Sequence, residues 1–221
     1  MNPEALIFDM DGVLIDNSPF YARAWDAFLQ QHPEAALPDY PASKTFGRRN
    51  ADLLHEVFAG QLSTVQVAAY SEHLERLYWQ MYLPHLTPIA GLLELMGEAK
   101  RRSMPLALAT SAPLASVDTV LQGLGLQQPP VFNSILTELD VRRGKPDPQV
   151  YQDSMLRLGV APERCVIFED ALVGVAAGCA AGARCIGLAT TYAPELLLEQ
   201  GAEMVIADYT DPRLRPWLGW G

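Results

Sequence analysis

Short apolar runs recur along the chain, and segments with apolar residues three or four positions apart separate most of them. Three to five consecutive apolar residues are typical of a strand that is buried on both faces of a parallel sheet. The predicted strands are residues 6–8, 105–109, 134–137, 165–168, 185–188 and 204–207. Because helical segments alternate with these strands from residue 89 onward, we expect an α/β fold with a doubly wound parallel sheet and right-handed crossovers.

Residues 17–84 have a different pattern, in which helix signals follow one another without a convincing strand between them. Ser18 is a suitable N-cap, and Pro19 suits the first turn of the helix that it would open. Ser63 and Gln66 fit a capping box at the start of a second, longer helix. The pattern therefore predicts an all-helical insertion after the first strand.

The length of the chain suits this division. With 221 residues, it is long enough for a core domain and one smaller insertion. We expect the α/β core at residues 1–16 and 85–221, and a small helical cap at residues 17–84. Hydrophobic residues make up 49% of the chain and no long low-complexity tract interrupts it, so a globular protein is expected.

The charge of the chain argues against some partners. The net charge is -10 and no basic stripe is present, so a nucleic-acid partner is not expected. The small apolar segment at residues 171–187 contains Arg184 and is too short to span a bilayer, so no membrane association is expected either. The first ten residues carry no basic side chain, unlike a signal peptide, and we expect a cytoplasmic location.

The three cysteines support the same location. Cys165, Cys179 and Cys185 are odd in number and lie in apolar segments. This arrangement predicts buried thiols in a reducing compartment rather than a disulfide framework.

Two carboxylates follow the first predicted strand. Asp9 ends the apolar run, and Asp11 and Gly12 come shortly after it. Ligands of an open parallel sheet bind just beyond the carboxyl ends of the strands, so both side chains could face one ligand. Carboxylates this close repel each other unless a cation or a shared proton relieves them, which indicates a Mg²⁺ site where one carboxylate could also attack an electrophile. The alternative is an ordinary surface turn, since Asp-x-Asp-Gly is also a turn sequence.

Three further motifs favour the site over the turn. Thr110 follows the second predicted strand, and Lys145 lies in a Gly-Lys-Pro-Asp-Pro segment. Glu169 and Asp170 follow the fourth predicted strand. Together with Asp-x-Asp-Gly-Val-Leu-x-Asp at residues 9–16, these motifs resemble, in their order, those of the haloacid dehalogenase (HAD) superfamily. The resemblance covers nearly the whole chain.

The resemblance implies a role for each motif residue. Asp9 would be the nucleophile, which attacks phosphorus and holds the phosphoryl group as an acyl phosphate. Asp11 would be the general acid and base, while its backbone carbonyl binds the metal. Lys145 would offset the repulsion among the carboxylates and the approaching phosphate. Asp170 would share a Mg²⁺ ion with Asp9, and Glu169 would assist directly or through a water.

Four residues are candidates for contacting the substrate. The Thr110 hydroxyl and the N-terminus of the helix that follows it could hold phosphate oxygens, with Ser111 as a second contact. The alternative at this position is an N-cap without a ligand. Arg48 and Arg49 follow a glycine in the insertion and could reach a second anionic group of the substrate. The alternative for this pair is a solvated position at the start of a helix.

The resemblance implies a Mg²⁺-dependent phosphatase that acts on a small phosphorylated metabolite, such as a sugar phosphate, through an aspartyl-phosphate intermediate. A phosphosugar mutase of the β-phosphoglucomutase type is the first alternative, because it keeps the same core motifs. Alignment with β-phosphoglucomutase through Arg23-Ala24-Trp25 puts Tyr21 where that enzyme has a histidine. Tyrosine cannot shuttle a proton near neutral pH as histidine does, and this favours hydrolysis.

Two other functions fit less well. A haloacid dehalogenase of the same fold lacks an acid at the position of Asp11. A non-enzymatic phospho-acceptor module would have no use for a cap at residues 17–84. The expected partner is therefore a small phosphorylated molecule, and the sequence does not indicate an oligomeric state.

Overall fold

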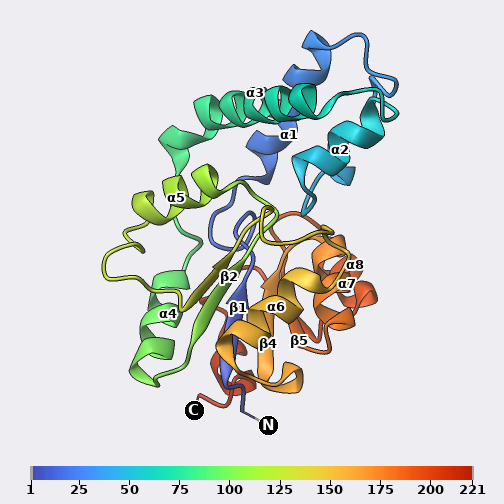
Figure 1. The fold of residues 1–221 in the computed structure, drawn as a ribbon. Helices are drawn as coiled ribbons and strands as arrows, with labels where there is room; N and C mark the ends of the chain where they lie inside the picture. Colours follow the sequence, from blue (N-terminus) through green and yellow to red (C-terminus); the bar gives the residue numbers. More distant parts are fainter. Residues whose placement is uncertain (1, 221) are drawn as a thin grey trace.

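The computed structural model describes residues 2–220, and its centre is a sheet of six parallel strands (Figure 1). The strand order is β3-β2-β1-β4-β5-β6, so the chain crosses back over β1 before it forms β4. In such a sheet, ligands bind at the carboxyl ends of the strands, where the order reverses. The six predicted strands and the doubly wound α/β class are confirmed. The strands are Ala5–Phe8 (β1), Leu106–Ala109 (β2), Ser134–Leu136 (β3), Cys165–Glu169 (β4), Arg184–Leu188 (β5) and Met204–Ile206 (β6).

Helices cover both faces of the sheet, because alternate residues of a buried strand point to opposite sides. Leu6 and Phe8 of β1 pack in the core that α4 and α5 cover, whereas Ile7 packs in the core that α6, α7 and α8 cover. No helix within residues 2–220 is both long and apolar enough to cross a membrane. The helices around the sheet are Leu92–Arg101 (α4), Leu114–Gly123 (α5), Gln149–Leu158 (α6), Leu172–Ala180 (α7), Pro194–Gln200 (α8) and Leu214–Trp217 (α9), with a 3₁₀ helix at Pro162–Arg164.

A helical block at residues 17–84 lies over the carboxyl ends of the strands (Figure 1). Its α1 has the predicted proline in the first turn, and its α3 begins with the predicted capping box of Ser63 and Gln66. Residues 17–84 are all described, and they contain no strand, as predicted. The elements of the block are Ser18–Gln31 (α1), Asn50–Val57 (α2), Thr64–Tyr82 (α3) and a 3₁₀ helix at Ala42–Lys44; a further 3₁₀ helix, Leu83–His85, follows α3.

Two segments connect the helical block to the sheet, and they lie side by side. Ile15, where the chain leaves the sheet, forms an antiparallel bridge with Pro88, where the chain returns. Beside this bridge, the backbone N–H of Ile89 donates to the carbonyl of Leu14 at 3.0 Å. The block is therefore an insertion whose first and last residues lie next to each other beside the sheet.

The position of Cys179 corrects the sequence analysis. Cys165 and Cys185 are buried as expected, but Cys179 lies on the exposed side of α7. The reason is that α7 packs against the sheet through glycine: a Cβ atom at Gly178 would lie 2.5 Å from the Sγ of Cys185. The residue after this glycine faces outward. All three thiols are free, and the Sγ atoms of Cys179 and Cys185 are 3.9 Å apart.

Candidate active site

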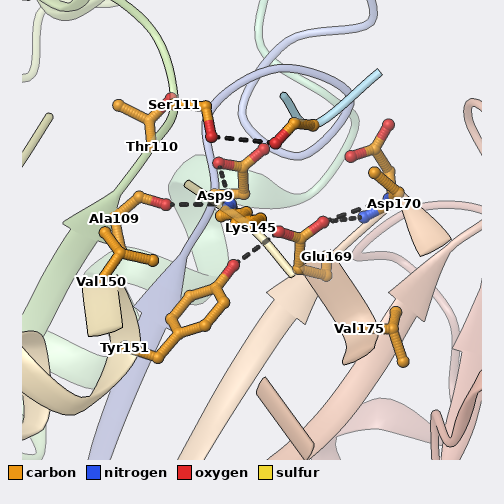
Figure 2. A network of polar contacts seen from close by, with 12 residues as sticks. Asp9, Ala109, Thr110, Ser111, Lys145, Val150, Tyr151, Glu169, Asp170 and Val175 are labelled. Carbon is orange, nitrogen blue, oxygen red and sulfur yellow. Dashed lines mark hydrogen bonds and ion pairs between the residues drawn. The ribbon is translucent and has the colours of Figure 1, made fainter. Parts of the chain in front are cut away.

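Polar side chains from separate motifs converge at the carboxyl ends of β1, β2 and β4. Asp9 follows β1, and Thr110 follows β2. Glu169 is the last residue of β4, and Asp170 comes next. Lys145 arrives from the segment between β3 and α6, and Figure 2 shows it among Asp9, Glu169 and the end of β2. The parallel sheet thus brings residues that are far apart in the sequence to one edge.

Lys145 is the centre of this group. Its Nζ donates to Asp9 Oδ1 at 2.8 Å, to Glu169 Oε1 at 2.6 Å and to the carbonyl of Ala109 at 3.3 Å. Burial alone would lower the pKa of Lys145, but the carboxylates of Asp9 and Glu169 outweigh this effect and hold the pKa above its usual value. The ammonium ion is therefore fixed and permanently charged.

Glu169 is held by hydrogen bonds on both oxygens. Oε1 accepts from Lys145 and, at 2.5 Å, from the hydroxyl of Tyr151, while Oε2 accepts from the backbone N–H groups of Asp170 and Ala171 at 3.0 and 3.1 Å (Figure 2). The glycine at position 174 makes room for it, because a Cβ on Gly174 would lie 1.9 Å from Oε1. This geometry orients Glu169 toward Lys145. The expected direct or water-mediated contact of Glu169 with a metal ion stays a prediction.

Asp170 lies close to Asp9 and to the tight turn at Gly12. Gly12, at φ +70°, allows this approach, since a Cβ there would lie 2.0 Å from Asp170 Oδ2. The hydroxyl of Thr191 donates to the same oxygen. One oxygen each from Asp9, Glu169 and Asp170 lies within 4.8 Å of the others.

The carboxylates in this group carry more negative charge than Lys145 offsets. Burial, moderated by Lys145, raises the pKa of Asp9 to about 6, and burial together with the charge of Glu169 raises the pKa of Asp170 well above its usual range. A hard divalent cation prefers carboxylate oxygens and would relieve this repulsion. The donor set therefore fits Mg²⁺ or a similar ion.

Asp11 lies beside these carboxylates and lines a cavity that the helical block covers. Asn17 Nδ2 donates to Asp11 Oδ1 at 2.6 Å and to the hydroxyl of Tyr78 at 2.8 Å, while the N–H of Gly12 donates to Asn17 Oδ1 at 3.1 Å. Burial and the charge of Asp9 raise the pKa of Asp11 to about 8. In this structure Asp11 can therefore carry a proton at neutral pH.

The cavity lies between the strand ends and the helical block. It is lined by Asp9, Met10, Asp11, Asn17, Ser18, Tyr21, Thr45, Phe46, Gly47, Arg48, Asn50, Glu75, Tyr78, Thr110, Ser111, Ala112, Pro113, Ser116 and Asp170. Thr110 Oγ1 accepts from the N–H of Ala112 at 3.1 Å, and Ser111 Oγ donates to the carbonyl of Gly47 at 2.9 Å. Both predicted phosphate contacts thus face the cavity just before the N-terminus of α5.

The two arginines of the helical block have different surroundings. Arg48 lines the cavity, and its guanidinium donates to Glu56 at 2.8 Å and to the hydroxyl of Tyr40 at 2.9 Å. Arg49 pairs with Asp52 at 2.8 Å and donates to the carbonyls of residues 141 and 142 at 3.3 and 3.4 Å. Arg49 therefore joins the block to the core loop between β3 and α6, and it does not line the cavity.

Several residues of the site carry no recognisable sequence signal. Asn17, Tyr78 and Glu75 reach the cavity from the helical block. Tyr151 reaches Glu169 from α6, and Thr191 reaches Asp170 from the loop after β5. An aromatic residue in α6 or a threonine in a loop is common in any α/β protein. Only the packing of these elements reveals the contacts.

A family model and two named relatives of this chain are all hydrolases. A family model described as haloacid dehalogenase-like hydrolase matches residues 3–182. The chain is 30% identical over 217 residues to validoxylamine A 7'-phosphate phosphatase of Streptomyces hygroscopicus subsp. limoneus, covering 94% of each chain. It is 31% identical to hexitol phosphatase A of Escherichia coli over 188 residues, which cover 85% of this chain and 84% of that enzyme.

A solved structure shares the fold over almost the whole chain. It is a HAD hydrolase of family IA, variant 3, from Entamoeba histolytica, with a TM-score of 0.84 and 26% sequence identity. The match covers 98% of each chain. The helical block and the sheet therefore occur together in that hydrolase.

Proposed function

The chain belongs to the haloacid dehalogenase-like hydrolase family, and from this premise we propose that it is a Mg²⁺-dependent phosphatase of small phosphorylated sugars or polyols. One observation carries the proposal. Lys145 is held at 2.8 Å from Asp9 and at 2.6 Å from Glu169, and Asp9 lines a cavity together with Asp11 and Asp170. A fixed cation, a nucleophilic carboxylate and a protonated carboxyl group together can accept and release a phosphoryl group.

The proposed reaction has two steps. Asp9 attacks phosphorus and forms an aspartyl phosphate, while Asp11 gives its proton to the leaving alkoxide oxygen. Asp11 then takes a proton from a water molecule, which attacks the same phosphorus atom and breaks its bond to Asp9. Inorganic phosphate leaves, and Asp9 returns as a carboxylate.

The surrounding residues would position these groups. Lys145 holds Asp9 Oδ1 and would screen the phosphate, and Glu169 orients Lys145 from behind. Asp9, Asp170 and the carbonyl of Asp11 would hold Mg²⁺, which supplies positive charge to the phosphate oxygens when bound. Thr110 and Ser111 would contact the remaining oxygens.

The helical block would act as the cap. We propose that residues 17–84 form a cap over a core of residues 1–16 and 85–221, and that closure excludes bulk water. The contact of Arg49 with the core loop supports a structural role for this arginine, and Arg48 remains the candidate for touching substrate. A cytoplasmic location is part of the proposal and rests on the sequence.

Hydrolysis is favoured over phosphosugar transfer. Relatives at 30% and 31% identity are named as phosphatases of validoxylamine A 7'-phosphate and of hexitol phosphates. Tyr21, at the position where β-phosphoglucomutase has a histidine, donates to Asn50 Oδ1 at 2.6 Å.

The test measures inorganic phosphate released from p-nitrophenyl phosphate and from a panel of sugar and polyol monophosphates. We expect release that needs Mg²⁺, stops with EDTA and returns when Mg²⁺ is added in excess. Isomerisation of β-glucose 1-phosphate without release of phosphate would favour the mutase. Absence of turnover on every compound would contradict both.

A further inference from the structure

The cavity has a second polar wall, formed mainly by the cap. The hydroxyl of Tyr21 donates to Asn50 Oδ1 at 2.6 Å, and Asn50 Nδ2 donates to Glu75 Oε1 at 2.9 Å. On the core side, Ser116 Oγ donates to Glu75 Oε2 at 2.6 Å and accepts from Trp79 Nε1 at 2.9 Å. This chain of hydrogen bonds fixes the carboxylate of Glu75 at the wall of the cavity.

Burial raises the pKa of Glu75, while the hydrogen bonds from Ser116 and Asn50 favour its carboxylate form, and the carboxylate makes this wall electronegative. The acidic and basic residues that line the cavity are Asp9, Asp11, Arg48, Glu75 and Asp170. Within the described part of the chain, Arg48 is the one cation in this lining, and its guanidinium already pairs with Glu56 at 2.8 Å. Lys145 and the carboxylates that would hold Mg²⁺ lie at the strand ends, so they leave the charge of Glu75 without a direct partner.

This arrangement suits hydroxyl groups and opposes a second anion. Each oxygen of Glu75 accepts one of these hydrogen bonds and has a further lone pair to accept another. A hydroxyl group can donate to a carboxylate in a strong, charge-assisted hydrogen bond. A phosphate or carboxylate on the same part of the substrate would instead meet a like charge in a poorly solvated space.

We propose that Glu75 selects substrates whose leaving group is uncharged and rich in hydroxyl groups, and rejects those that carry a second anionic group. The proposal rests on the proposed phosphatase function and assigns the cap wall as its specificity determinant. It excludes bisphosphates and phosphorylated acids as preferred substrates. It favours monophosphates of polyhydroxy alcohols and of neutral sugars.

The experiment compares matched substrate pairs. Glycerol 1-phosphate has a hydroxymethyl group where 3-phosphoglycerate has a carboxylate, and fructose 6-phosphate has a hydroxyl group where fructose 1,6-bisphosphate has a second phosphate. We expect the wild type to prefer the neutral member of each pair in kcat/KM by on the order of 100-fold. Where a compound is not turned over, its KI against p-nitrophenyl phosphate replaces KM.

Glu75→Gln keeps the shape of the side chain and removes its charge. It should reduce the preference at least about tenfold, chiefly by lowering KM or KI for the anionic member. Glu72→Gln is the matched control, since Glu72 is an exposed residue on the same helix, and it should leave the preference unchanged. A loss of activity in Glu75→Gln that is equal for both members would mean a purely structural role.

The wild type alone can overturn the proposal. A preference below about tenfold contradicts it whether or not the variant folds. Failure of the proposed function looks different, because no compound would then release phosphate. The same pairs, compared by their thermal-shift affinities, would still decide whether Glu75 rejects the anionic member.

Discussion

The two walls of the cavity differ in how they hold their polar groups. At the strand-end wall, Asp9 and Asp170 line the cavity, and Lys145 and Glu169 lie next to them outside the lining. All four are between 0% and 4% exposed, and the ion pairs of Lys145 hold Asp9 and Glu169 in place. At the cap wall, Tyr21 and Glu75 are only partly buried, and neutral donors hold the one carboxylate. The first wall presents fixed charges, and the second presents hydrogen-bonding groups.

This difference separates two tasks. Fixed charges in a dry site stabilise charge that develops during a reaction, but they tolerate little movement. They stand on a sheet whose strands cannot shift independently. Hydrogen-bonding groups on a helical block whose two connections to the core lie side by side can contact a substrate and then release it. Variants at the two walls should therefore affect different kinetic constants.

The largest effect is expected from Asp9→Asn. The amide is not a nucleophile, so turnover should fall below detection for every substrate while the melting temperature stays within a few degrees of the wild type. Asp26→Asn, an exposed carboxylate on α1, is the matched control and should keep full activity. Retention of more than a few per cent of turnover by Asp9→Asn would contradict covalent catalysis at the strand-end wall.

The next largest effect is expected from Asp11→Asn. Loss of a general acid and base lowers kcat by about 10²–10⁴-fold. The loss should be smaller for p-nitrophenyl phosphate than for a sugar phosphate, because nitrophenolate leaves without needing a proton. Single-turnover release of the alcohol or of nitrophenol, which comes before hydrolysis of the aspartyl phosphate, measures this for each substrate. An equal loss for both would show that Asp11 does not protonate the leaving group.

Much of the strand-end wall could be predicted from the sequence, and little of the cap wall. Asp9, Thr110 and Asp170 each follow an apolar strand, and parallel strands of one sheet necessarily end at the same edge. The apolar pattern of α3 predicts a helix, and the buried residues of that helix are Leu74, Tyr78 and Tyr82. The pattern does not predict that Glu75 reaches the cavity, because this depends on how the whole helix lies across the core.

The role of Glu169 shows a second limit. An acidic pair after a strand has the same sequence whether one residue or both bind a metal ion. In the structure, the contacts of Glu169 with Tyr151 and Lys145, and the space left by Gly174, give Glu169 surroundings that differ from those of Asp170. These contacts come from α6, α7 and a distant loop, and no short pattern contains them.

Lys145→Met should affect folding as well as activity. It leaves Asp9 and Glu169 buried without their cation, and breaking a buried ion pair on one side costs about 3–5 kcal/mol of unfolding free energy. Urea unfolding measures the loss, with Lys100→Met on the exposed surface of α4 as the control. Mg²⁺ should restore part of the lost stability. A stability equal to the wild type would mean that the strand-end wall does not depend on this charge.

The pH dependence of the stability of the metal-free protein tests the same wall without a substitution. Burial raises the folded-state pKa of Asp9 to about 6 and that of Asp11 to about 8, both above the ordinary value of 3.8. The folded state therefore binds more protons than the unfolded state between about pH 4 and 8, and its stability falls as pH rises through this window. In EDTA, the melting temperature should be lower at pH 8.5 than at pH 6, by about 2–4 °C for each kcal/mol lost.

Mg²⁺ should remove most of this pH dependence, because the cation replaces the protons as the partner of the carboxylates. The Asp9→Asn, Asp11→Asn double variant should also show a flatter profile in EDTA. A melting temperature that rises from pH 6 to pH 8.5 in EDTA would contradict the charge excess at the strand-end wall.

The smallest effect is expected at the cap wall, from Tyr21→Phe. The change removes the hydroxyl that donates to Asn50 Oδ1 at 2.6 Å. One net hydrogen bond is worth about 0.5–1.5 kcal/mol, so KM for a polyol phosphate should rise by up to about tenfold while kcat changes by less than about twofold. Tyr70→Phe is the matched control, since Tyr70 donates to Glu34 at 3.1 Å elsewhere in the cap, and it should leave KM unchanged. A 100-fold loss of kcat in Tyr21→Phe would instead mean that this position takes part in proton transfer, as the histidine at the corresponding position does in the mutase alternative. Both walls would then take part in catalysis. The assignment of catalysis to the strand-end wall and of substrate recognition to the cap wall would be wrong.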